Sequence, residues 1–245
     1  MQRNDTLEAR ADALNADYRH HSAIAVLARA LHDPDLGQLA LVSSFGAESV
    51  VLLHMVALAR RDTPVIFLDT GMLFTETLVY QQELAERLRL SDLRIIRTDA
   101  SALRNADPDD TLHQRDTDAC CALRKTVPLA NALEGFDGWI TGRKRYQGGS
   151  RAGLEFFEAD RATGRLKVNP LAHWAPGDAR TYIEENRLPR HPLVAKGFPS
   201  IGCAPCTAPV AAGEDPRAGR WRGQEKTECG IHFTNGQLTR QGESA

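Results

Sequence analysis

The chain has 245 residues, of which 42% are hydrophobic and 25% charged, and a formal net charge of −2. This length suits one α/β core with a small appended part, and the near-neutral charge gives no argument for a nucleic-acid or membrane partner. No apolar run approaches the ~18 residues that span a bilayer, and the mixed-charge N-terminus lacks the apolar segment of a secretory signal. We therefore expect a cytoplasmic protein that binds neither nucleic acid nor membranes.

Strands and helices are predicted to alternate through the first half of the chain. Residues 6–31 carry apolar side chains at helical spacing and predict one or two helices. Short apolar strands are then predicted at 39–45, 64–69, 93–98 and 138–141, and helices at about 48–61, 75–90 and 119–133. Such alternation predicts an α/β fold with a doubly wound, mostly parallel sheet flanked by helices. Its ligands should bind at the carboxyl ends of the strands.

The pattern changes after Gly142. Residues 154–157 and 165–169 flank the sequence ADRATG, which predicts a β-hairpin, and a further helix is predicted at 177–187. From Leu188 onward proline, glycine and charged residues dominate. We therefore expect less regular structure in the last quarter of the chain.

Two strand-end motifs suit a nucleotide. SSFGAES, residues 43–49, places Ser44, Gly46 and Ser49 before a helix, where backbone N–H groups and the helix dipole favour an anion such as phosphate. It lacks the Gly-Lys-Ser/Thr of a Walker loop. LDTG, beginning at Leu68, ends the next strand and could hold an adenine or ribose. The alternatives are an ordinary capped helix and an ordinary turn.

Two basic stretches suit an anionic ligand. TGRKRYQGGSR, residues 141–151, interleaves Arg143 and Arg151 with glycines, and RAGRWRG, residues 217–223, contains Arg217 and Arg220. Guanidinium groups bind anions through forked donors. A solvated basic surface is the alternative for both stretches.

Four of the five cysteines form two pairs. Cys120 and Cys121 are adjacent, and Cys203 and Cys206 form a C-x-x-C. In a cytoplasmic protein such a set indicates metal binding or catalysis rather than disulfides, and two thiolate pairs predict a tetrathiolate metal site. Adjacent cysteines suit a [4Fe–4S] cluster better than a zinc knuckle. Zinc and a C-x-x-C redox pair stay open as alternatives.

Cys229 stands apart in the polar stretch TECGIHFTNGQ, residues 227–237. A thiol there has no structural task. A nearby cation would lower its pKa and raise the thiolate fraction, and His232, Arg217 or Arg220 could supply that cation. We expect Cys229 to be a reactive thiol.

Together these motifs resemble one family, the assimilatory sulfonucleotide reductases, and within it the adenylyl-sulfate reductases. The resemblance covers residues 39–232 and is carried most specifically by CC at 120–121, CAPC at 203–206 and ECGIH at 228–232. SSFGAES, FLDTG and TGRKRYQGGSR match the family's nucleotide-site segments. The resemblance implies an adenine nucleotide α-hydrolase-like (PP-loop) fold. It also implies reduction of adenosine 5′-phosphosulfate (APS) to sulfite and AMP by thioredoxin, in sulfate assimilation and cysteine biosynthesis.

The resemblance also implies roles for single residues. Cys229 is the catalytic nucleophile that forms an S-sulfocysteine, and Lys125 is the lysine between cluster and substrate. His232, Arg217 and Arg220 contact the phosphosulfate. The other substrate-binding residues are Ser44, Gly46, Ser49, Leu68, Arg143 and Arg151, and the ligands of a [4Fe–4S] cluster are Cys120, Cys121, Cys203 and Cys206.

On this basis the chain divides into an N-terminal helical segment (1–35), a nucleotide- and cluster-binding α/β domain (36–210) and a flexible C-terminal tail (211–245) that carries Cys229. We also expect a homo-oligomer. The alternatives are a reductase using the 3′-phosphorylated substrate (PAPS), an iron–sulfur tRNA thiolation enzyme of the PP-loop class, and a non-catalytic nucleotide-binding module with a structural zinc. The family branch that uses PAPS typically lacks the four cluster cysteines, which favours APS here.

Overall fold

The fold is built on one six-stranded sheet with strand order β3-β2-β1-β4-β6-β5. The computed structural model describes residues 2–161, 163–224, 226 and 228. Every neighbouring pair of strands is parallel except β5 and β6, which are antiparallel. The strands are β1 (Leu39–Ser43), β2 (Val65–Leu68), β3 (Leu93–Ile96), β4 (Gly138–Ile140), β5 (Phe157–Asp160) and β6 (Arg165–Val168). The predicted doubly wound, mostly parallel sheet is confirmed.

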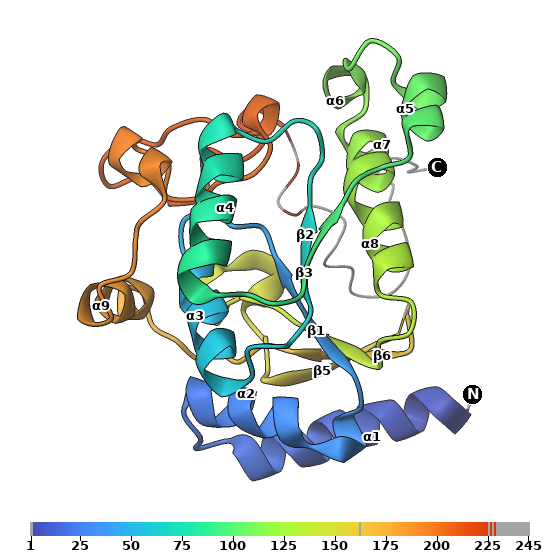
Figure 1. The fold of residues 1–245 in the computed structure, drawn as a ribbon, viewed down its shortest axis with the longest axis vertical. Coiled ribbons are helices and arrows are strands. Elements are labelled where there is room, and N and C mark those ends of the chain that lie inside the picture. The colour runs from blue at the N-terminus through green and yellow to red at the C-terminus, as the bar shows by residue number, and fades with distance from the viewer. Residues whose placement is uncertain (1, 162, 225, 227, 229–245) are drawn as a thin grey trace, which may run out of the picture.

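Helices cover both faces of this sheet (Figure 1). Of the two N-terminal helices, α1 runs beside the edge strand β5, where Asn15 donates to the Phe157 carbonyl at 2.8 Å, and the longest helices of the central part flank the sheet. The helices are α1 (Gln2–Tyr18), α2 (Ala23–His32), α3 (Ser49–Ala59), α4 (Thr75–Leu88), α5 (Ala100–Ala106), α6 (Leu112–Arg115), α7 (Thr117–Cys121), α8 (Val127–Ala132) and α9 (Asp178–Glu185). Within the described residues, no helix is both long enough and apolar enough to cross a membrane.

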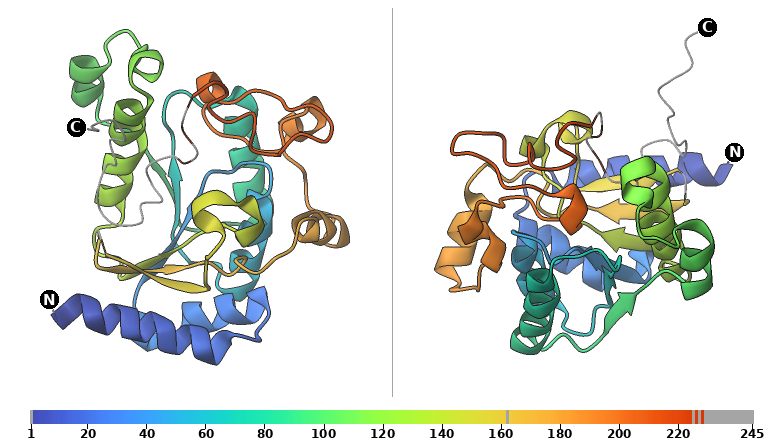
Figure 2. Two further views of the ribbon diagram at one scale, coloured as in Figure 1. Left: turned by 180° about the vertical axis from the view of Figure 1, so that it is seen from behind. Right: turned by 90° about the horizontal axis from the view of Figure 1, so that it is seen from above.

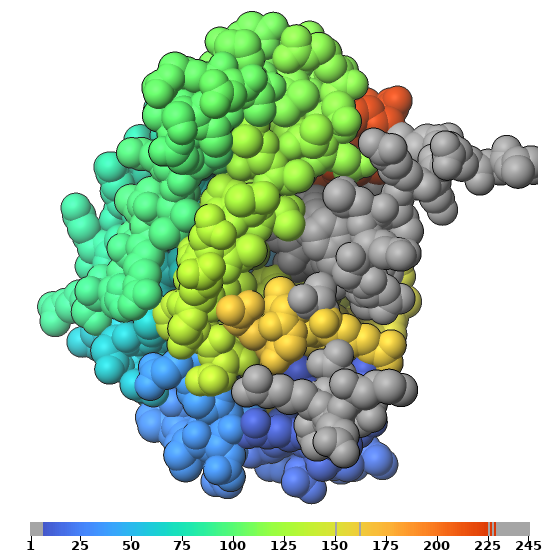
Figure 3. All heavy atoms as spheres, turned by 90° about the vertical axis from the view of Figure 1, so that its right-hand side faces the viewer, coloured from blue at the N-terminus to red at the C-terminus, as the bar shows by residue number. Residues whose placement is uncertain are grey.

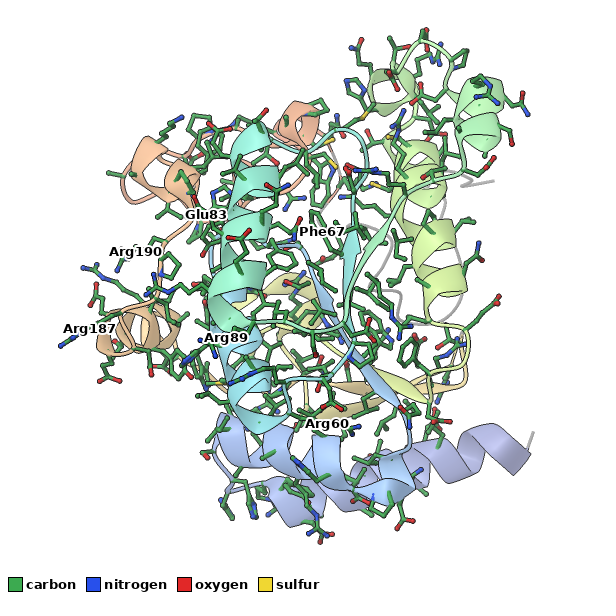
Figure 4. The ribbon with its side chains drawn as sticks, in the orientation of Figure 1. Arg60, Phe67, Glu83, Arg89, Arg187 and Arg190 are labelled. Atoms are coloured by element: carbon green, nitrogen blue, oxygen red, sulfur yellow. The ribbon has the colours of Figure 1, made fainter. Side chains whose placement is uncertain are left out.

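Successive side chains of each central strand enter two different apolar cores, one on each face of the sheet. In β1, Leu39 and Leu41 belong to the larger apolar core with α2, α3 and α4, whereas Ala40 belongs to a smaller core under α8. Because successive side chains of a strand point to opposite faces, a strand buried on both faces is apolar throughout. Phe67 of β2 lies in the middle of the molecule, whereas Arg187 and Arg190 lie at its edge (Figure 4).

The segment between β3 and β4 is the least regular helical part. It runs down one side of the molecule as a continuous band (Figure 3). One helix is predicted at 119–133, but α7 passes into a π-helical turn at Ala122–Thr126 before α8 begins. The short helices α5 and α6 were not predicted, because they contain no buried residue and so show no apolar periodicity.

The predicted hairpin forms, but its first strand was placed three residues too early. The strand is FEAD, residues 157–160, rather than LEFF. Its two acidic residues interrupt the apolar pattern that predicts a strand. The fold accommodates them because each has a partner. Asp160 pairs with the buried Lys167 at 3.1 Å, and Glu158 accepts hydrogen bonds from Arg143 and Asn169.

Candidate active site

A cavity of about 230 Å³ lies at the carboxyl ends of the parallel strands, where the sheet topology predicts a ligand. The loops around it lie at the end of the sheet opposite α1 and α2 (Figure 2). Nine residues predicted for the site line this one cavity: Ser44, Gly46, Ser49, Leu68, Lys125, Arg143, Arg151, Arg217 and Arg220. The fold therefore brings together motifs that are far apart in the sequence.

The turn between β1 and α3 presents polar groups to the cavity. Phe45 adopts a left-handed backbone with φ 48°, which is uncommon for a residue with a Cβ. Its ring is buried and packs edge-on against Phe67, with centroids 5.1 Å apart. The Gly46 N–H donates to Ser49 Oγ at 2.9 Å, and that oxygen lies 3.4 Å from Ser44 Oγ. Core packing of Phe45 thus fixes a turn whose hydroxyls and helix N-terminus face the cavity.

The turn after β2 forms the adjoining wall. Gly71 has φ 71° and donates its N–H to Asp69 Oδ1 at 3.0 Å, while the Met72 N–H donates to Thr70 Oγ1 at 3.2 Å. These bonds close the LDTG turn within itself. Leu68 and Thr70 are left lining the cavity beside Ser44.

The two cysteine pairs meet at this same turn. Cys120 and Cys121 end α7, immediately before the π-helical turn. The C-x-x-C loop joins the β2 turn through the Ala204 N–H, which donates to the Met72 carbonyl at 2.8 Å. Thr70 links the two segments: its hydroxyl is 3.3 Å from Cys203 Sγ, and its carbonyl accepts from Arg124, in the turn after Cys121, at 2.8 Å.

The ionisation of the thiols reflects how close they are. Burial, together with repulsion by Cys121, raises the pKa of Cys120 to about 11. Burial and repulsion by Cys203 likewise raise the pKa of Cys206. Burial also acts to raise the pKa of Cys203, but the Lys125 charge and hydrogen bonds from Thr70 and Lys125 outweigh it, so this pKa is lowered. Four such thiols ionise together when a cationic centre compensates them.

The four cysteines of the predicted metal site form two pairs on separate segments. All four sulfurs are free thiols and act electrostatically on one another. Within the described ranges, however, no three His, Cys, Asp or Glu side chains converge closely enough for a single metal ion. A zinc ion needs all its sulfurs about 2.3 Å from one point, whereas a cuboidal cluster takes one thiolate at each of several separated irons. Four thiols on two neighbouring segments are the donor set that the predicted cluster requires, and the choice between cluster and zinc stays a prediction.

The cavity is strongly basic. Six basic side chains line it against two acidic ones, Glu48 and Glu228. Glu48 pairs with Lys144 at 2.8 Å, and Glu228 pairs with Arg151 at 2.6 Å and Arg217 at 3.5 Å. The cavity therefore retains a net positive charge suited to an anionic ligand.

Arg220 differs from its neighbours. Among the residues that the structure describes it has no carboxylate partner, and its buried Nε has no hydrogen-bond partner. The guanidinium lies over the Trp221 ring, 4.5 Å from its centroid. Its position depends on Gly202, since a Cβ there would lie 2.3 Å from Arg220 Nη2. Arg220 is thus positioned at the cavity wall with unused donor capacity.

Several site residues were not predicted. Glu48 and Glu228 lie inside predicted motifs, but their positions in the sequence give no role. Thr70 and Trp221 likewise gain significance only from their partners in the fold. Cys229 and His232 lie outside the residues that the structure describes, so their predicted roles stay predictions. The domain boundaries at 35 and 210 and the homo-oligomer also stay predictions.

Sequence and structure comparisons agree on the class of protein. The fold is adenine nucleotide α-hydrolase-like, as predicted: a phosphoadenylyl-sulfate (PAPS) reductase from Candida auris, solved as a phosphate complex, superposes with a TM-score of 0.70 at 26% identity, covering 81% of this chain and 96% of the other. The model of the phosphoadenosine phosphosulfate reductase domain matches residues 38–209. The chain belongs to this reductase family.

Curated relatives carry two names within the family. An adenosine 5′-phosphosulfate reductase from Mesorhizobium japonicum is 48% identical over 94% of this chain and 90% of its own length. A phosphoadenosine 5′-phosphosulfate reductase from Gloeobacter violaceus is 44% identical over 80% of this chain and 82% of its own.

Proposed function

We propose that this protein is an adenosine 5′-phosphosulfate reductase of sulfate assimilation, which reduces APS to sulfite and AMP with reduced thioredoxin. The 48% identity to the Mesorhizobium enzyme over nearly the whole chain carries this proposal. The site agrees with it, since a nucleotide-type turn and a basic wall line one cavity, and Thr70 of that lining lies 3.3 Å from Cys203 Sγ. Reduction of a small anionic nucleotide also agrees with a cytoplasmic location.

The nucleotide is held at the strand ends. The adenosine lies along the turns at Ser44 and Leu68, and its phosphate meets the α3 N-terminus near Gly46 and Ser49, where backbone N–H groups favour an anion. Arg143, Arg217 and Arg220 supply positive charge around the phosphosulfate. Arg151, predicted for the same role, pairs with Glu228 instead. This assignment is supported by the way these side chains line one cavity.

The chemistry begins with the Cys229 thiolate. Its sulfur attacks the sulfonate sulfur, an S–S bond forms, and the S–O bond to phosphate breaks, so AMP leaves with the electron pair. A thioredoxin thiolate then attacks Cys229 Sγ and sulfite leaves with the second electron pair. The second thioredoxin thiol resolves the mixed disulfide and frees Cys229. The two electrons that reduce the sulfonate thus come from thioredoxin.

Cations make the first step possible because two anions meet. Charges 4 Å apart repel by ~4 kcal/mol at an effective dielectric near 20. Lys125 and Arg220 lie at the cavity wall, and donors fixed in advance at a site of developing charge stabilise the transition state. His232 belongs to the same proposed set.

Cys120, Cys121, Cys203 and Cys206 would hold a [4Fe–4S] cluster, which supplies a fixed charge near Lys125 and needs no electron transfer here. Buried donors without partners at Arg220 Nε and Trp221 Nε1 support an anionic group in this region.

Replacing Cys203 with Ser should remove bound iron and the absorbance on the order of 400 nm typical of such clusters. Cys229→Ser should retain both. Stoichiometric zinc in a colourless wild-type protein would refute the cluster assignment.

The second candidate is a PAPS reductase, favoured by the names of the Gloeobacter and Candida relatives. Anaerobic sulfite release with reduced thioredoxin, compared between APS and PAPS, decides between them. Without thioredoxin, mass spectrometry should find one SO3 on the peptide containing Cys229. Turnover of PAPS alone would establish the second candidate. Consumption of ATP with no sulfite from either substrate would instead indicate a thiolation enzyme.

A further inference from the structure

The carboxylate of Glu228 is bound by two guanidiniums at the rim of the cavity. Arg151 donates from Nε to Oε1 at 2.6 Å and from Nη2 to Oε2 at 2.7 Å, which is a bidentate pair. Arg217 lies 3.5 Å from the same carboxylate. The Arg151 side chain is 8% exposed, and its Nη1 donates to Gln147. The donor directions of Arg151 are therefore committed to Glu228 and Gln147 rather than to the cavity.

The residues just before Glu228 are held independently on α7. Lys226 Nζ donates to the Thr117 carbonyl at 3.2 Å and pairs with Asp118. Thr117 Oγ1 donates to Gln224 at 2.8 Å. The segment thus contacts the helix that ends in Cys120 and Cys121, and then contacts the arginine loop through Glu228.

We propose that Glu228 is a positioning residue that anchors the end of this segment at the cavity, so that Cys229 starts its attack from a fixed point. The proposal rests on the proposed function, in which Cys229 is the nucleophile. Consecutive α-carbons lie about 3.8 Å apart, so fixing Glu228 limits where Cys229 can reach. Arg151 then serves the reaction through Glu228 rather than through the nucleotide.

The charges favour an anchor over an anion that substrate must displace. If the Glu228 carboxylate only occupied the arginines until substrate displaced it, the preceding residues would need no attachment of their own. Lys226 and Gln224, however, hold the same segment on α7. An unpaired carboxylate beside an attacking thiolate would repel it. Pairing with two guanidiniums neutralises Glu228 and lets the adjacent thiolate approach an anionic substrate.

Glu228→Gln tests the anchor because it removes the charge and keeps the size. Glu214→Gln is the matched control: Glu214 precedes this segment in the chain, is 29% exposed against 23% for Glu228, and pairs with Arg222 at 2.9 Å. With excess APS and no thioredoxin, quenched samples give the rate of adduct formation on Cys229. We expect Glu228→Gln to slow it about 10- to 100-fold, the effect of losing a charge-assisted bond, with AMP affinity within about twofold of wild type. Glu214→Gln should match wild type in both.

A double-mutant cycle with Arg151→Gln identifies the pathway. If Arg151 acts through Glu228, the double variant should be no slower than Glu228→Gln alone, because Arg151 has no further role once Glu228 is replaced. The anchor would be overturned if the rate losses of the two single variants multiplied in the double variant. It would also be overturned by an unchanged rate in Glu228→Gln, or by an AMP affinity that changes more than about twofold. A wild type that forms no adduct would refute the proposed function instead.

Discussion

The two halves of the cavity are built in different ways. The nucleotide half consists of the turns after β1 and β2, where backbone groups and hydroxyls rest on an apolar core through Phe45 and Phe67. The other half consists mainly of charged side chains from the loops at residues 143–151 and 217–228 and from Lys125, joined by ion pairs and loop contacts. The first half is fixed by packing and the second by electrostatics.

This difference separates affinity from rate. Packed backbone groups contact parts of a nucleotide that do not change in the reaction, so they contribute equally to ground and transition states. Charged groups beside the breaking S–O bond act where charge develops. Substitutions in the nucleotide half should therefore change affinity, and substitutions in the electrostatic half should change the rate.

Cys229→Ser gives the largest expected effect. Sulfite production should fall about 10⁴-fold or more, as when other covalent nucleophiles are removed, while AMP binding measured by calorimetry stays intact. Substantial sulfite production by this variant would show that Cys229 is not the nucleophile.

Arg220→Ala comes next. Loss of a preorganised donor should lower the single-turnover rate about 10²- to 10³-fold, with little change in AMP affinity. Arg222→Ala is the control, because Arg222 is an exposed neighbour paired with Glu214 and does not line the cavity. Equal losses in both variants would point to a general charge effect.

Gly202→Ala sharpens the comparison. The new Cβ would lie 2.3 Å from Arg220 Nη2 and displace the end of a flexible side chain, leaving the backbone in place. The rate should fall about tenfold, a part of the loss expected for a missing donor. Gly153→Ala is matched to it, since a Cβ there meets nothing within 4 Å. A wild-type rate in Gly202→Ala would mean that the position of Arg220 is unimportant.

Ser49→Ala should have the smallest effect, and the effect should be on affinity rather than on rate. Its hydroxyl accepts from the Gly46 N–H, and losing one such bond costs about 1 kcal/mol. AMP affinity should therefore weaken about fivefold with an unchanged rate at saturating APS. The exposed Ser91→Ala serves as control. A lower saturated rate with unaltered affinity would contradict the separation of the two halves.

The same division explains what could be predicted from the sequence. Ser44 and Gly46 closely follow one apolar strand and Leu68 ends the next, and parallel topology places strand ends together. The central strands were predicted within a few residues, because burial on both faces leaves continuous apolar runs. The cysteines and arginines were recognisable as motifs.

The partners of the charged groups could not be predicted. The contact between Glu228 and Arg151 joins residues 77 positions apart, and the contact between Thr70 and Cys203 joins residues 133 apart. Side-chain pairing at such separation follows from the finished fold and leaves no local periodicity. The strand 157–160 was misplaced for the same reason, since Asp160 is buried through its pairing with Lys167.

The π-helical turn at Ala122–Thr126 sets the angular phase between two surfaces of one continuous helix. Upstream it presents Cys120 and Cys121, and downstream Leu129 packs into the apolar core under the sheet. Removing one residue from the turn would restore ordinary α-helical winding and rotate one surface against the other by about 100°. Either the two cysteines or Leu129 could then keep its present position, but not both. The length of this stretch is therefore constrained as strictly as its cysteines.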